Sequence, residues 1–159
     1  MSQVLYKLNE NLKLQLTIYE EFNTLEREKQ KALIENNLHE IELITAQQET
    51  LLLSASRLEK ERLLWIEPIG HELRKAPEEL TLAELAEHFP VLEEVRLELD
   101  RVVGQLHEIL EINTQLLHQA MKIVNFTLGM LTNENKNTYT NPKHKENERT
   151  IQNLLDRRI

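Results

Sequence analysis

The sequence of 159 residues has no cysteine, only three glycines and four prolines, and 4% aromatic residues. Without cysteine, the chain can form neither a disulfide framework nor a thiolate metal site. Few helix breakers and many Leu, Glu, Lys and Gln residues favour an all-α protein. No apolar run approaches about 18 residues, so we expect no membrane insertion. The N-terminus lacks the basic and apolar parts of a secretory signal, so we expect a cytoplasmic protein.

Positive charge is also scarce, because the net charge of the chain is −8. Residues 133–159 carry six basic and four acidic side chains, so residues 1–132 have a net charge of −10. An acidic body is unsuited to the phosphate backbone of nucleic acids. We therefore expect no nucleic-acid partner.

Catalytic and metal-binding patterns are missing as well. The sequence has no glycine-rich phosphate loop and no Ser beside a His in a nucleophile context. None of the six histidines belongs to a His-x-x-x-His pair or follows a Glu by three residues, as in di-iron bundles. We expect no enzyme activity, no cofactor and no metal site.

What the sequence does contain is long apolar repeats at helical spacing, the longest at residues 92–131. If Leu92 is position a of a heptad, the a and d positions follow one another by three and four residues. They are Leu92, Val95, Leu99, Val102, Leu106, Ile109, Asn113, Leu116, Ala120, Ile123, Thr127 and Met130. Five of the six e positions are also apolar. The buried face is therefore wider than a two-stranded coiled-coil seam and can contact two helices. We expect a long scaffold helix with the other helices laid along it.

Two further helices are predicted before it. Residues 4–35 follow helical spacing, although residues 12–18 alternate as a strand would; the flanks decide for a helix. Asn37 can cap a second helix at residues 38–66, with Glu40 three residues on in the manner of a capping box. The short break at Asn36 and Asn37 favours an antiparallel hairpin, with one continuous helix as the alternative.

A connector follows, marked by Pro68, Gly70, Pro77 and Pro90. We expect no long helix to cross it intact. Within it, Thr81 and Glu84 form a second capping box ahead of a short amphipathic helix with Leu82, Leu85, Ala86 and Phe89. Pro90 can open the long helix at its first turn. The predicted fold is thus an elongated antiparallel bundle or coiled coil of three long helices and one short connector helix.

The chain divides into a helical domain at residues 1–132 and a tail at 133–159. Residues 133–149 are polar, rich in Asn and unable to form a core, so we expect them to be flexible. Residues 150–159 bring back Ile151, Leu154, Leu155 and Ile159, which suit a short terminal helix. Such a helix would be marginal by itself.

The second half of the long helix has more apolar side chains than one buried face needs. Ile112 and Phe126 occupy g positions, and Met121, Val124, Leu128 and Leu131 form a second stripe. This surplus is either covered within the chain, by a dimer mate, or by a partner. The candidate partner-binding residues are Ile112, Leu117, Met121, Val124, Phe126, Leu128, Met130 and Leu131. Asn113, a polar residue at an a position, is predicted to mark the boundary between scaffold and partner-binding halves.

The order of these parts resembles the FlgN family of flagellar export chaperones. The similar segments are the acidic helix at residues 38–52, the short helix at 80–85, and the Asn-x-x-Leu-Leu stretch at 113–117 followed by Val124, Asn125 and a polar tail with Tyr139. The resemblance covers residues 5–140. Where that family often has a Gly just after the tail Tyr, this sequence has Thr140, Asn141 and Pro142.

The resemblance implies a cytoplasmic chaperone that binds the C-terminal helical segments of hook–filament junction proteins. Such a chaperone prevents their premature assembly and delivers them to the export gate, whose cytoplasmic domain would contact Tyr139. A homodimer is a further possibility. The alternative class is a structural or adaptor coiled-coil protein that self-associates and has no export client.

Overall fold

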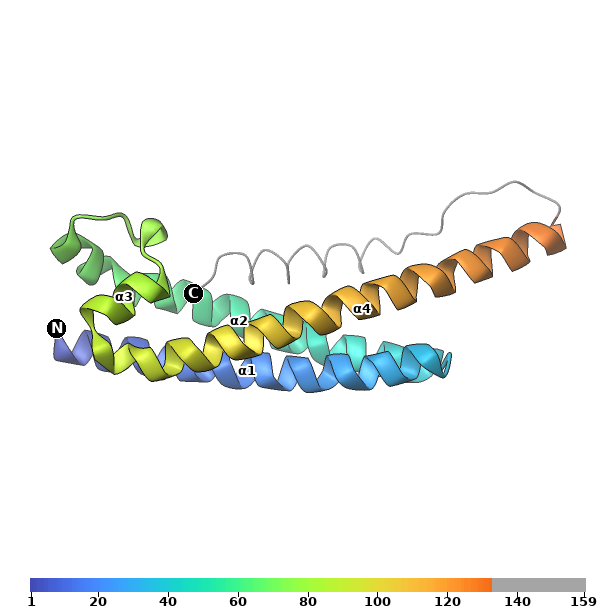
Figure 1. Ribbon diagram of the computed structural model, residues 1–159, viewed down its shortest axis with the longest axis horizontal. Coiled ribbons are helices and arrows are strands. Elements are labelled where there is room, and N and C mark those ends of the chain that lie inside the picture. Colours follow the sequence, from blue (N-terminus) through green and yellow to red (C-terminus); the bar gives the residue numbers. More distant parts are fainter. Residues whose placement is uncertain (133–159) are drawn as a thin grey trace.

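The computed structural model describes residues 1–132 as three long helices, one short helix and two 3-10 turns, without strands. The long helices are α1 (Ser2–Ile34), α2 (Leu38–Leu73) and α4 (Glu93–Thr132). The 3-10 turn η1 (Pro77–Glu79), α3 (Leu82–His88) and the turn η2 (Pro90–Leu92) connect α2 to α4 at the end of the bundle near the N-terminus (Figure 1). The all-α prediction is confirmed. The predicted tail, Tyr139 and the terminal helix lie outside the described residues.

The hairpin between α1 and α2 forms as predicted, so the continuous helix is excluded. Asn36 takes φ 53°, the left-handed conformation that Asn adopts more readily than most residues. The side chain of Asn37 accepts a hydrogen bond from the backbone N–H of Glu40 at 3.2 Å. The backbone N–H of Asn37 donates to the carbonyl of Ala32 near the end of α1, so the reciprocal bond to Glu40 is absent and the predicted capping box is only half formed.

The second capping box is complete, because Thr81 and Glu84 exchange both hydrogen bonds. Leu82, Leu85 and Ala86 then bury the apolar side of α3 against the core. Pro90 opens the turn η2, which leads directly into α4. These predictions held because each depends on neighbouring residues only.

The expected break of the second helix at Pro68 is wrong, since α2 continues through this residue to Leu73. A proline removes one backbone donor and crowds the carbonyl four residues earlier, here that of Leu64. Pro68 and Leu64 are both exposed, so that carbonyl can turn to water. Ile66 and Ile69 are fully buried on the other side and hold the helix to the core.

The organising helix is α1, not α4 as the sequence suggested. Both α2 and α4 run close along α1, whereas α2 and α4 hardly approach each other at the backbone. The hydrogen-bonded pairs Asn23–Gln105 and Glu26–Asn113 follow the same order along both helices, so α4 is parallel to α1. The main core joins residues near the start of α1, the end of α2, α3 and the first half of α4.

Candidate functional site

The C-terminal end of α4 projects beyond the tip of the α1–α2 hairpin (Figure 1). Its last buried residue is Asn113. Beyond it, most of the large apolar side chains are exposed, among them Val124 at 54%, Phe126 at 70% and Leu131 at 78%. The apolar surplus is therefore not covered by the described part of the chain.

The boundary at Asn113 is a buried polar cluster that ties the three long helices together. The Asn113 Nδ2 donates to the backbone carbonyl of Glu26 at 2.7 Å and to its Oε2 at 2.6 Å. The Gln48 Nε2 of α2 donates to Glu26 Oε1 at 2.6 Å, and Lys29 Nζ lies 3.6 Å from the same oxygen. All four side chains are buried. Beyond this cluster, α4 makes no further buried contact among the described residues.

The a/d series was predicted to stay buried along the whole helix, and this is wrong after Asn113. Ile123 and Met130, both in the series, are 67% and 70% exposed. One reason is that α1 ends at Ile34. The other is that a heptad line drifts by about 20° per repeat around a straight α-helix, so it leaves the contact side over several repeats.

The eight candidate partner-binding residues consequently lie on two sides of α4. One side continues the contact line with α1, and we call it the seam face: Leu117, Met121, Val124, Leu128 and Leu131. The other side, which we call the outer face, consists of Ile112, Leu116, Ile123, Phe126 and Met130. At 100° per residue, the centres of the two faces are about 140° apart. Leu116 and Ile123, on the outer face, were not among the candidates because the heptad pattern assigned them to the core.

Apart from these faces of α4, an apolar hollow of about 470 Å³ lies between α1 and α2. Its lining includes Leu25 and Leu51, with Glu21, Thr24, Gln47 and Thr50 around them. By helical spacing it is on the side of α1 turned away from α4. Four of its six lining side chains are exposed polar ones, and nothing in the structure indicates an occupant.

Within the described residues, no three His, Asp or Glu side chains are grouped so that they could hold a metal ion. Over the same residues, no helix is long and apolar enough to cross a membrane. The ion pairs of Arg96 with Glu93 and of Lys75 with Glu84 are on the surface, whereas the bidentate pair of Arg62 with Glu59, at 2.6 Å, is buried within α2. The chemistry that the projecting end of α4 offers is thus apolar contact with another helix.

The sequence matches the model of one protein family, described as FlgN protein, over residues 1–147. No curated protein and no solved structure matches the chain. The matched range includes all described helices, and with them the whole projecting end of α4.

Proposed function

The chain belongs to the FlgN family of flagellar export chaperones for the hook-associated proteins FlgK and FlgL, which is non-enzymatic, and we propose that it binds the C-terminal helical segments of these clients on the seam face of α4. The observation that supports this proposal is that the seam face continues a buried line of α4. The seam face prolongs the line on which Leu99, Val102 and Leu106 pack against α1. A client helix in this place would continue the bundle beyond the hairpin tip.

Apolar burial supplies the affinity in this proposal. Fully burying an exposed Leu, Val or Met side chain contributes about 1.5–3 kcal/mol. The seam face presents three exposed side chains, Val124, Leu128 and Leu131, beside the half-buried Leu117 and Met121. Because the client's own apolar side is then covered, it is kept from assembling early. No nucleotide is needed, since binding and handover suffice.

The remaining parts of the proposal concern location and delivery. We propose that the protein works in the cytoplasm, that residues 1–132 form the client-binding domain, and that the tail at 133–159 reaches the cytoplasmic domain of the export gate through Tyr139. A homodimer is also proposed. Tyr139→Ala should reduce capture by an immobilised gate domain while client binding persists; equal capture would remove Tyr139 from the proposal.

The test of client binding is co-elution of the full chain with the C-terminal segment of FlgK in gel filtration. Val124→Asp should weaken binding at least about 100-fold, because a charge would be buried in the complex. Asn125→Asp is the matched control, since it adds the same charge one residue on, on the polar side of α4, and should bind normally. Circular dichroism should show the same helix content for all three proteins.

Two results would contradict the proposal. If the unmodified chain fails to co-elute with the C-terminal segments of both FlgK and FlgL, client binding by these segments is wrong. A self-associating structural protein would then be the better description. If Val124→Asp binds as well as Asn125→Asp, the client lies elsewhere.

A further inference from the structure

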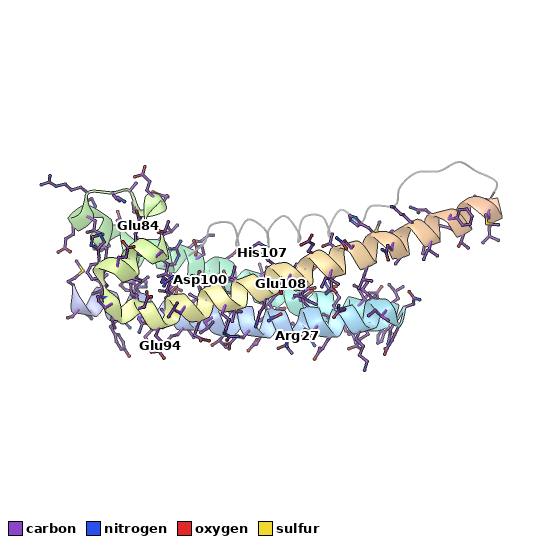
Figure 2. All side chains as sticks on the ribbon, viewed as in Figure 1. Arg27, Glu84, Glu94, Asp100, His107 and Glu108 are labelled. Carbon is purple, nitrogen blue, oxygen red and sulfur yellow. The ribbon has the colours of Figure 1, made fainter. Side chains whose placement is uncertain are left out.

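One line along the solvent side of α4 changes its chemistry at Ile112. Residues on this line follow each other by three or four positions. In the first half of the helix they are charged or polar, namely Glu94, Glu98, Arg101, Gln105 and Glu108, and Figure 2 labels Glu94 and Glu108 on α4. The same line then continues with Ile112, Leu116, Gln119, Ile123, Phe126 and Met130. The apolar residues of this second part are the outer face, and Gln119 lies among them.

The first part of the line makes polar contacts with α1. The Asn23 Nδ2 donates to Gln105 Oε1 at 3.3 Å, and the Arg101 Nη2 lies 4.0 Å from Glu20 Oε1. The second part has no such neighbour among the described residues, and Ile112, Ile123, Phe126 and Met130 are all exposed. The residues of this line are polar where they contact α1 and become apolar where those contacts end. Such an exposed apolar surface indicates a second interface.

The client helix proposed for the seam face does not cover this surface. A helix packs on a stripe about 100° wide or somewhat wider, whereas the two faces are centred about 140° apart by helical spacing. The outer face therefore needs an occupant of its own.

We propose that the outer face pairs with the outer face of a second copy of this chain, with the two helices antiparallel. The spacing of the six positions is four, three, four, three, four, which reads the same in both directions. A two-fold axis beside residue 121 therefore places Ile112 opposite Met130, Leu116 opposite Phe126, and Gln119 opposite Ile123. A two-fold contact of this kind is self-complementary and closed.

Charge favours a second copy over a charged partner. Lys122 is the only formally charged residue at positions 112–132, in a chain with 29% charged residues. Lys122 lies on the polar side of α4 by helical spacing, so like charges do not oppose each other in the pair. The two Gln119 side chains would be about 6 Å apart along the helix axis, close enough for their amides to bond and fix the alignment as buried polar residues do in coiled coils.

The size of the contact sets the expected strength. Residues 112–130 span about 27 Å of helix, so the buried area falls at the low end for specific interfaces. We expect a dissociation constant on the order of 10 μM. This inference deepens the proposed homodimer and does not depend on client binding.

The first experiment is sedimentation velocity of the full chain over a concentration series. The unmodified protein should change from monomer to dimer, and Phe126→Asp should remain monomeric because it would place two charges in the contact. Asn125→Asp should dimerise as the unmodified protein does. If the unmodified chain is still a monomer at about 200 μM, well above the affinity expected for an interface of this size, the inference is wrong.

The second experiment uses the absence of cysteine to test the orientation. A mixture of Ile112→Cys and Met130→Cys chains should form an inter-chain disulfide under mild oxidation. Neither variant alone should do so, because like residues would be about 27 Å apart along the axis, far beyond the Cα separation of about 7 Å that a disulfide allows. Cross-linking of each variant with itself, and not of the mixture, would show parallel helices and overturn the antiparallel pairing.

The two faces also give separable outcomes with the FlgK segment. Phe126→Asp should lose the dimer and keep the client, whereas Val124→Asp should lose the client and keep the dimer. If Phe126→Asp loses client binding as strongly as Val124→Asp, the outer face belongs to the client and the proposed dimer interface is wrong. A monomeric chain that binds the client would overturn only the dimer.

Discussion

At the scale of single residues, Asn113 fixes where the bundle ends. Its amide bonds the buried Glu26 carboxylate and carbonyl, so Asn113→Ala removes two hydrogen bonds, one of them to a charged group. We expect a loss of about 2 kcal/mol in the free energy of unfolding, measured by urea denaturation. Asn125→Ala is the control and should be neutral or slightly stabilising, since Ala is the better helix former. Equal effects of both changes would contradict the role of the cluster.

Tyr19 is the residue for which the structure gives a pH dependence. Burial, with a smaller contribution from nearby Glu59 and opposed by Arg62, raises the pKa of Tyr19 from 10 to about 12. A phenol with a raised pKa stabilises the fold below pH 10, and that contribution is lost as the pH rises through 12. The unfolding free energy should thus fall by about 2 to 3 kcal/mol over this range.

Tyr19→Phe isolates this effect from the titration of the lysines. The difference in unfolding free energy between the unmodified chain and Tyr19→Phe should be constant up to pH 10 and then shift against the unmodified chain as the pH approaches 12. A difference that stays constant to pH 12 would mean that Tyr19 ionises as freely in the folded protein as in the unfolded one.

At the scale of elements, two helical glycines have opposite surroundings. A Cβ on Gly70 would lie 2.7 Å from the backbone carbonyl of Lys75, where α2 turns into the connector. A Cβ on Gly104 would meet nothing within 4 Å. We expect Gly104→Ala to stabilise the protein by up to about 1 kcal/mol through helix propensity. Gly70→Ala should destabilise the protein although Ala gains helix propensity there too, because the backbone at Lys75 would have to move away from the new Cβ. Thermal unfolding of the two variants tests this, and stabilisation by both would contradict the close approach at Gly70.

The elements also show what the sequence could predict. The hairpin at Asn36, the two caps and the start of α4 depend on neighbouring residues, and all were predicted from spacing and residue type. Pro68 was misread because its effect is decided by distant packing, with Ile66 and Ile69 holding the helix together. The central role of α1 was missed for a similar reason. Its interior side carries Asn11, Gln15, Asn23, Glu26 and Lys29, so its apolar pattern is weak although all five are buried.

The candidate site was predicted only in part, because part of it depends on local composition and part on distant packing. Local composition revealed that the second half of α4 has surplus apolar residues. It could not show that α1 ends before them, nor that the heptad line rotates away from the contact side. Leu116 and Ile123 were therefore assigned to the buried series, and the division into a seam face and an outer face became visible only in three dimensions.

At the scale of the whole molecule, stability should decrease along α4. Residues 95–106 are held by α1 and α3, whereas none of residues 117–132 is buried, and helical stability in proteins comes mostly from the packing of a buried face. In solution more dilute than the dissociation constant expected for the proposed dimer, we expect amide hydrogen exchange at 117–132 to be at least about 100-fold faster than at 95–106. Mass spectrometry of peptides from the two regions measures this gradient.

The same exchange experiment distinguishes the two partners of the projecting end. Adding the FlgK C-terminal segment should slow exchange at 117–132 in the unmodified chain and in Phe126→Asp, but not in Val124→Asp. Raising the protein concentration without client should slow it in the unmodified chain and in Val124→Asp, but not in Phe126→Asp. If residues 117–132 are already as protected as 95–106 in the dilute monomer, the end of α4 is held by the chain itself. Neither surface would then be free to bind.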